Sequence, residues 1–181
     1  MNIPNLITLL RIILVPVIVI LLIQGSFLEA LVVFLVASIS DALDGFLARV
    51  MKQQTSIGAY LDPIADKALL ASTFVTLSIL HIIPPWLTVI VISRDFIILL
   101  GVSVLFIMEF SVEIRPALVS KMTTVLQAGT LLLALFTQCL PCQFKTVWLD
   151  GFYWMTAIFT VISGLNYMWR GLRIINNHTS S

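Results

Sequence analysis

Six apolar stretches of about 20 residues, separated by short polar or proline-containing breaks, make up nearly the whole chain. Each is as long as a transmembrane helix must be, because about 20 residues at about 1.5 Å per residue cross the hydrocarbon core of a bilayer. They cover residues 6–23, 28–50, 58–80, 86–108, 117–140 and 148–169. We therefore expect an all-α integral membrane protein with about six transmembrane helices, in a single domain of residues 1–181.

The composition excludes several other classes of protein. Of the 181 residues, 60% are hydrophobic and only 10% are charged, whereas a soluble domain has about 25% charged residues. This content of charged residues is too low for a soluble catalytic domain or a disordered chain. It is also too low for a protein that binds nucleic acid through a basic surface. We expect membrane lipid, and no nucleic acid, among the partners.

The Lys and Arg residues between the stretches and near their ends predict the orientation. With a cytoplasmic N-terminus, seven of them fall on the inner side and one, Lys145, on the outer side. Because inner loops carry the excess of positive charge, we expect a multi-pass protein of the cell (inner) membrane with both termini in the cytoplasm. The seven inner residues are Arg11, Arg49, Lys52, Arg115, Lys121, Arg170 and Arg173.

Several charged residues lie inside the predicted membrane spans. A charge is costly in hydrocarbon, so an ionisable residue at that depth indicates a functional site that faces the bundle interior or a water-filled cavity. We therefore expect the functional site among seven residues: Asp41, Asp44, Asp62, Asp66, Lys67, Arg94 and Asp95.

The aspartates are spaced so that helices would bring them together. Asp41 and Asp44 are three residues apart in the second span, and Asp62 and Asp66 are four apart in the third. Both spacings place a carboxylate pair on one helical face. The connection between the spans is short, so we expect antiparallel neighbours whose four carboxylates converge in the cytoplasmic half of the membrane.

Four carboxylates in a low-dielectric site require cations, because their negative charges repel one another. Oxygen ligands suit Mg²⁺, Mn²⁺ or Ca²⁺ rather than zinc. Asp41 and Asp66 would lie about 12 to 14 Å from the cytoplasmic helix ends, which predicts a hydrated pocket open to the inner leaflet. A remote alternative is a divalent-cation channel or carrier, although its acidic groups would then occupy one half of the membrane only and Arg94 would obstruct it.

Small residues accompany the carboxylates. Gly45, Ala48 and Gly58 leave room for a ligand to approach the backbone, and Arg49 can bind phosphate oxygens. The alternative is that the small residues let two membrane helices pack closely. Because they alternate with the aspartates, we interpret them as the floor of a ligand site.

The combined pattern resembles a known family signature. Residues 41–49 (DALDGFLAR), followed by Gly58, Asp62 and Asp66, match the signature of the CDP-alcohol phosphotransferase family at every defining position. Residues 2–5 (NIPN) with Thr8 and Arg11, and residues 62–67 (DPIADK), are similar to the branch of that family that makes phosphatidylglycerophosphate and cardiolipin.

The resemblance implies a reaction. CDP-diacylglycerol would be the donor, an acceptor hydroxyl would attack the phosphatidyl phosphorus, CMP would leave, and the enzyme would be a homodimer. Asp66 would be either a metal ligand or the catalytic base. One or two Mg²⁺ or Mn²⁺ ions would be held by Asp41, Asp44, Asp62 and Asp66, and the cytidine nucleotide would be contacted by Gly45, Ala48, Arg49 and Gly58.

The acceptor site is expected to contain cations if the acceptor is glycerol 3-phosphate, which carries its own phosphate. The candidates are Lys67, Arg94, Arg115 and Lys121. Two of them have an alternative role: Arg94 would pair with Asp95 or with an aspartate of another span, and Arg115 would anchor the inner interface.

The chain departs from the usual phosphatidylglycerophosphate synthase pattern at two places. Residues 93–95 (SRD) have Asp where those enzymes typically have Glu and lack a further Arg nearby, and residues 120–124 (SKMTT) have one Lys where they have two. Both segments look similar to eukaryotic-type cardiolipin synthases, whose acceptor is phosphatidylglycerol. We expect glycerol 3-phosphate as the acceptor, with phosphatidylglycerol as the alternative.

Overall fold

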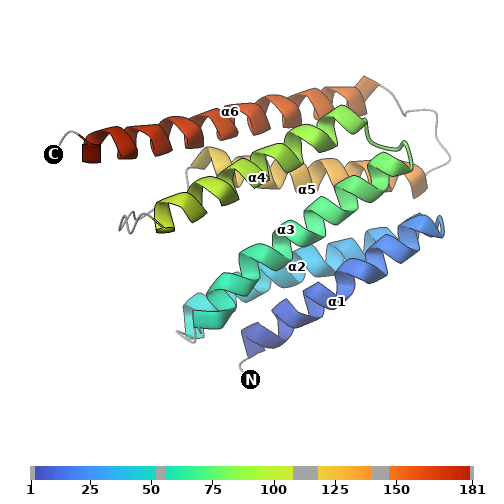
Figure 1. Ribbon diagram of the computed structural model, residues 1–181. Helices are drawn as coiled ribbons and strands as arrows, with labels where there is room; N and C mark the ends of the chain where they lie inside the picture. The colour runs from blue at the N-terminus through green and yellow to red at the C-terminus, as the bar shows by residue number, and fades with distance from the viewer. Residues whose placement is uncertain (1–2, 52–55, 108–117, 140–146, 180–181) are drawn as a thin grey trace. The chain divides into compact units, whose positions relative to one another are not determined.

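The computed structural model describes residues 3–51, 56–107, 118–139 and 147–179, with side chains at 8–40, 64–101, 120–139 and 148–169. These residues form helices joined by short turns, and they include no strand. Beyond its first turn, an α-helix pairs its backbone amides within the same segment, as a bilayer requires. The helices of the described part are α1 (Ile3–Ile23), α2 (Phe27–Met51), α3 (Ser56–Ile79), α4 (Pro85–Ile107), α5 (Leu118–Cys139) and α6 (Val147–Thr179) (Figure 1).

The predicted all-helical class is confirmed for the described residues, and each apolar stretch coincides with one helix. The predicted end of the last stretch was too early for the helix, because α6 continues beyond residue 169 to Thr179 through a polar segment. Where side chains are described, Ser120–Cys139 is long and apolar enough to cross a membrane, and Thr8–Ile23 and Phe27–Ser40 are shorter apolar helices. Six membrane crossings therefore remain a prediction.

Two helix ends are closed by the same backbone motif. After α1, Gly25 has a positive φ of 77°, Ser26 N donates to Leu21 O, and Gly25 N donates to Leu22 O. This is the Schellman arrangement, which glycine adopts without strain. After α3, His81 takes the same role with φ 56°, although a β-carbon disfavours that conformation.

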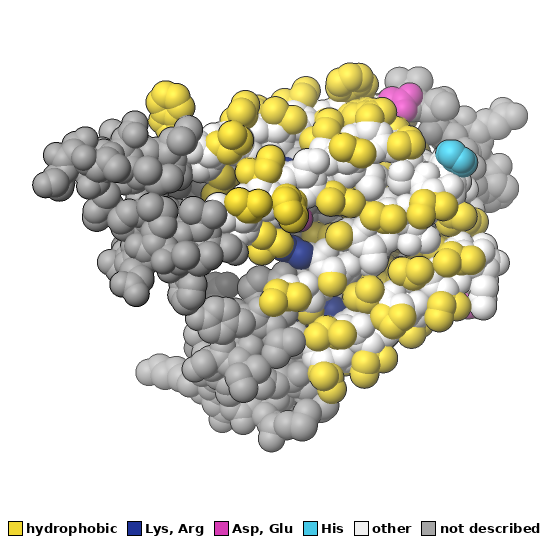
Figure 2. Space-filling view, in the orientation of Figure 1, with side chains coloured by type: hydrophobic (Ala, Val, Ile, Leu, Met, Phe, Trp, Pro, Cys, Tyr) yellow, Lys and Arg dark blue, Asp and Glu magenta, His cyan; other side chains and the backbone are white. Residues whose placement is uncertain are grey.

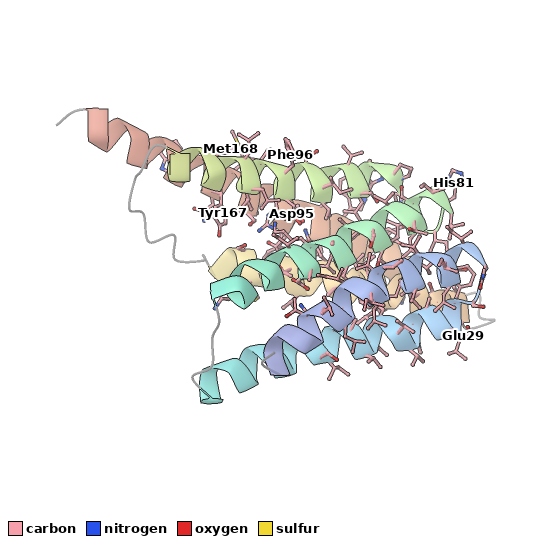
Figure 3. The ribbon with its side chains drawn as sticks, turned by 60° about the horizontal axis from the view of Figure 1, so that its bottom comes forward. Glu29, His81, Asp95, Phe96, Tyr167 and Met168 are labelled. Atoms are coloured by element: carbon pink, nitrogen blue, oxygen red, sulfur yellow. The ribbon has the colours of Figure 1, made fainter. Side chains whose placement is uncertain are left out.

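The helices form two compact units, to both of which α5 contributes. Unit 1 comprises Met1–Pro85 and Leu131–Lys145, and unit 2 comprises Trp86–Thr130 and Thr146–Ser181. In unit 1, α1 packs against α2 and α3 (Figure 1). Glu29 in the first turn of α2 and His81 after α3 lie at the same end of this unit (Figure 3). Its buried apolar side chains include Ile18, Leu22, Phe34, Ala37, Leu69, Phe74 and Leu77.

Unit 2 has a polar interior between α5 and α6. Thr123 Oγ1 donates to the carbonyl of Phe159 at 3.3 Å, and Gln127 Nε2 donates to Thr160 Oγ1 at 3.4 Å. Such side-chain hydrogen bonds hold helices together where hydrocarbon offers no competing partner. The buried polar residues of these two helices are Thr123, Gln127, Thr130, Thr156, Thr160 and Ser163.

Apolar side chains are exposed on both units. Ile79 in unit 1 is 71% exposed, and Val125 and Trp148 in unit 2 are 71% and 78% exposed. On the face drawn in Figure 2, hydrophobic side chains are spread over the described helices, and charged side chains are sparse. Exposed apolar surface on this scale is what contact with lipid requires, and a soluble monomer does not maintain it.

Candidate active site

The backbone carries the four predicted carboxylates on two helices of unit 1. Asp41 and Asp44 are on α2, and Asp62 and Asp66 are on α3. Both segments are continuous helix, so the three- and four-residue spacings do place each pair on one helical turn. Since α2 ends at Met51 and α3 begins at Ser56, five residue steps separate their ends by at most about 18 Å.

Asp66 is the one candidate metal ligand whose side chain is described, and it is half-buried. Its neighbour Lys67 has its Nζ atom screened from solvent, and both side chains have partners within the protein. The side chains of Asp41, Asp44 and Asp62 lie outside the described part, and within that part no three His, Cys, Asp or Glu residues gather. Four carboxylates fit a hard divalent cation by their donor chemistry, and the predicted metal site remains a prediction.

Unit 1 also contains a buried cation that the sequence analysis placed among the inner-side charges. Arg11 on α1 is 1% exposed, and Thr8, one turn earlier, is 2% exposed. Both have interaction partners within the protein. Arg11 is therefore an internal cation of the unit that carries the aspartates.

Arg94 is the best-defined candidate residue, and its partners all belong to unit 2. It is 5% exposed. Its Nη1 pairs with Asp95 Oδ1 at 2.6 Å, and its Nη2 donates to Ser120 Oγ at 2.7 Å and to Ser163 Oγ at 2.8 Å. Gly164 lies beside the aliphatic stem of the arginine, since a β-carbon there would be 3.5 Å from Arg94 Cγ. The expected alternative, pairing with Asp95, is therefore realised.

Asp95 and its neighbour Phe96 lie in different surroundings. Figure 3 shows Asp95 and Phe96 projecting from different sides of α4, in agreement with a partly buried Asp95 and a 63% exposed Phe96. The Asp95 carboxylate thus lies inside unit 2, while the Phe96 ring lies on the surface of the unit.

Ser120 and Ser163 were not among the predicted partners of Arg94. A signal was present on α6, where Thr156, Thr160 and Ser163 recur every three or four residues and form a polar stripe in the apolar part of the helix. A buried stripe of this kind marks the face that contacts other polar groups.

The remaining candidates are less well defined. Lys121 is exposed at the start of α5, and Arg115 lies outside the described residues. The side chains of the predicted nucleotide-binding residues also lie outside the described part, although their backbones are helical. These residues are Gly45, Ala48, Arg49 and Gly58.

Comparison with known proteins identifies the family. The model of the CDP-alcohol phosphatidyltransferase family matches residues 1–163. The chain belongs to this family. It is therefore an enzyme of phospholipid biosynthesis, and not the cation channel or carrier considered for the carboxylates alone.

The relatives are named for two different reactions. A Mycobacterium tuberculosis protein named probable phosphatidylglycerophosphate synthase is 35% identical over 96% of this chain and 83% of its own length. An Aquifex aeolicus protein named CDP-diacylglycerol–glycerol-3-phosphate 3-phosphatidyltransferase is 31% identical over 97% of this chain and 98% of its own. A human protein named cardiolipin synthase (CMP-forming) is 30% identical over 96% of this chain and 63% of its own.

Proposed function

We propose that this enzyme transfers the phosphatidyl group of CDP-diacylglycerol to glycerol 3-phosphate, which yields phosphatidylglycerophosphate and CMP. The observation that carries the proposal is the helical placement of the complete aspartate signature on α2 and α3 of one compact unit. The choice of acceptor is supported by the relative from Aquifex aeolicus, which is named for this reaction and is similar over nearly its whole length.

The carboxylates are proposed to prepare the donor. Asp41, Asp44, Asp62 and Asp66 would hold one or two Mg²⁺ or Mn²⁺ ions against the pyrophosphate. When bound, such an ion neutralises phosphate charge and stabilises the departing CMP. On the donor side, the small residues Gly45, Ala48 and Gly58 would leave room for the cytidine nucleotide, and Arg49 would bind a phosphate oxygen.

Asp66 is proposed as the catalytic base. The acceptor oxygen forms a bond to the phosphatidyl phosphorus, the bond from phosphorus to the CMP oxygen breaks, and CMP keeps that electron pair. The proton of the acceptor hydroxyl passes to the Asp66 carboxylate. The half-buried position of Asp66 supports this role, because partial burial limits competition from water.

The acceptor phosphate is proposed to bind cationic side chains. Arg94 is the leading residue, because it is fixed by hydrogen bonds and keeps its Nε without a partner among the described residues. Lys67 in unit 1, and Arg115 and Lys121 in unit 2, are separate candidates for the same role.

Cardiolipin synthesis is the second candidate, with phosphatidylglycerol as the acceptor. The specific observation in its favour is the ion pair of Arg94 with Asp95. An arginine whose charge is balanced in this way suits a phosphodiester with one negative charge better than a phosphomonoester with two. The similarity to the human cardiolipin synthase points in the same direction.

The setting is proposed to be the cell (inner) membrane, crossed by six helices with both termini in the cytoplasm. In unit 2, the rings of Trp86 and Trp154 are 5.0 Å apart, near the starts of α4 and α6. An aromatic pair at one level fits the outer membrane interface. A homodimer is proposed from the family resemblance.

One experiment separates the two candidates. Purified protein is incubated with CDP-diacylglycerol, Mg²⁺ and each acceptor in turn, and the lipid product is identified by mass. Phosphatidylglycerophosphate formed from glycerol 3-phosphate supports the proposal. Cardiolipin formed only when phosphatidylglycerol is supplied would replace it with the second candidate, and no product with either acceptor would refute both.

A further inference from the structure

The buried guanidinium of Arg94 joins three helices of unit 2. Arg94 is on α4, Ser120 on α5 and Ser163 on α6, and the two serine oxygens lie 2.7 and 2.8 Å from the same nitrogen, Nη2. Asp95 Oδ1 lies 2.6 Å from the other terminal nitrogen. The side chain is therefore fixed in position and orientation from three sides.

Some hydrogen-bond donors of this cluster have no acceptor among the described residues. A guanidinium has five N–H donors. The two serines take both hydrogens of Nη2, and Asp95 takes one from Nη1. The second hydrogen of Nη1 and the Nε–H are left over from these three bonds, and the buried Nε has no partner within the described part of the chain.

The two serine hydroxyls add further donors. Each oxygen accepts a hydrogen from Nη2 and keeps its own hydroxyl proton, because a serine hydroxyl both accepts and donates. Neither Ser120 nor Ser163 donates to another described side chain or carbonyl. The cluster thus contains two charged N–H groups and two hydroxyl protons that these bonds leave available.

We propose that Ser120 and Ser163 are positioning residues that hold Arg94 and, together with its Nε–H, form a site for a phosphate oxyanion of the acceptor. This inference rests on the proposed function, in which Arg94 binds the phosphate of the acceptor. Grouped N–H and O–H donors are the chemistry that phosphate oxygens bind. The phosphate is either the monoester of glycerol 3-phosphate or the diester of phosphatidylglycerol, and the assay distinguishes them.

The test removes one hydroxyl at a time. Ser163→Ala should raise the KM of the acceptor about tenfold, as expected for losing one hydrogen bond to a charged group, with the KM of CDP-diacylglycerol and kcat nearly unchanged. Ser163→Thr, which retains the hydroxyl, should restore the acceptor KM. The matched control is Ser72→Ala in unit 1, where the hydroxyl donates to the Leu69 carbonyl of its own helix. It should leave both KM values at the wild-type level.

A second variant and a binding measurement keep the proposal testable. Ser120→Ala carries the same expectation if Ser163→Ala does not yield folded protein, and calorimetric titration with glycerol 3-phosphate should show the same weakening without turnover. An unchanged acceptor KM in folded variants, or an equal change in both KM values, would overturn this inference alone. A wild-type enzyme that forms product with neither acceptor would instead refute the proposed function.

Discussion

The hydroxyl oxygens of Thr130 on α5 and Thr156 on α6 lie 2.6 Å apart in the buried interior of unit 2. Thr130 Oγ1 also donates to the Leu126 carbonyl of its own helix at 2.8 Å. A hydroxyl has one proton, so Thr156 is the donor and Thr130 the acceptor. The hydroxyl of Thr156 therefore bonds across to the other helix, whereas the hydroxyl proton of Thr130 bonds within its own helix. Mutation can reveal this difference.

Thr156→Val should destabilise the protein. The change keeps the shape of the side chain and removes the donor, while Thr130 retains its bond to Leu126. The free energy of unfolding should fall by about 0.6 to 1.5 kcal/mol, the usual value of one interhelical hydrogen bond. The measurement is denaturant unfolding in mixed micelles, followed by circular dichroism.

The control for this prediction is Thr137→Val in unit 1, whose hydroxyl donates only to Ala134 of its own helix among the described residues. It should have a smaller effect. A double-mutant cycle of Thr130→Val and Thr156→Val should give a nonzero coupling energy. A coupling energy of zero would show that the close contact adds no stability.

The aspartates should differ in role. Asp44→Asn should abolish both metal and nucleotide binding, because it removes a charged ligand from the proposed metal site. Asp66→Asn should lower kcat by about 10²- to 10⁴-fold while CDP-diacylglycerol still binds, if Asp66 acts chiefly as the base. Binding is measured by titration with the nucleotide in the presence of Mg²⁺, and turnover by release of CMP.

Metal removal gives the companion result. Treatment with EDTA should abolish activity, and addition of Mg²⁺ or Mn²⁺ should restore it, because oxygen ligands favour these ions. Equal loss of nucleotide binding in Asp44→Asn and Asp66→Asn would identify Asp66 as mainly a ligand. Full activity in either variant would contradict the assignment of the carboxylate site.

The helices and the placement of the aspartates on them could be predicted because both depend on local sequence. An apolar stretch of membrane length forms a helix wherever its neighbours lie, and the Asp62–Asp66 spacing defines a helical face once the helix exists. Neither inference requires knowledge of tertiary contacts.

The pairing of Arg94 with Asp95 was among the expectations, but its two serine partners could not be predicted in the same way. They depend on which faces of α4, α5 and α6 meet, and Ser163 is separated from Arg94 by 69 residues. Arg11 and Thr8 were singled out by the family resemblance, but their burial depends on contacts between helices that the local pattern does not define. At His81, the backbone adopts a conformation that favours glycine, and local propensity does not predict it.

The orientation in the membrane has a direct test. A single cysteine placed at Lys52, between α2 and α3, should be protected from a membrane-impermeant thiol reagent in intact cells and become labelled after permeabilisation, because the excess of basic residues predicts a cytoplasmic location. A matched cysteine at Lys145 should be labelled from outside. Labelling of the Lys52 position in intact cells would reverse the proposed topology.

The acceptor prediction concerns Arg94. If glycerol 3-phosphate is the acceptor, Arg94→Lys should raise its KM about 10- to 100-fold, because a lysine keeps the charge but loses the fork that binds phosphate oxygens and both serines. The KM of CDP-diacylglycerol should change much less, since Arg94 has no proposed contact with the donor. Steady-state kinetics with each substrate varied in turn provide the measurement, and thermal unfolding shows whether the variant is folded. An equal rise in both KM values would mean that Arg94 supports the fold of unit 2 without binding the acceptor.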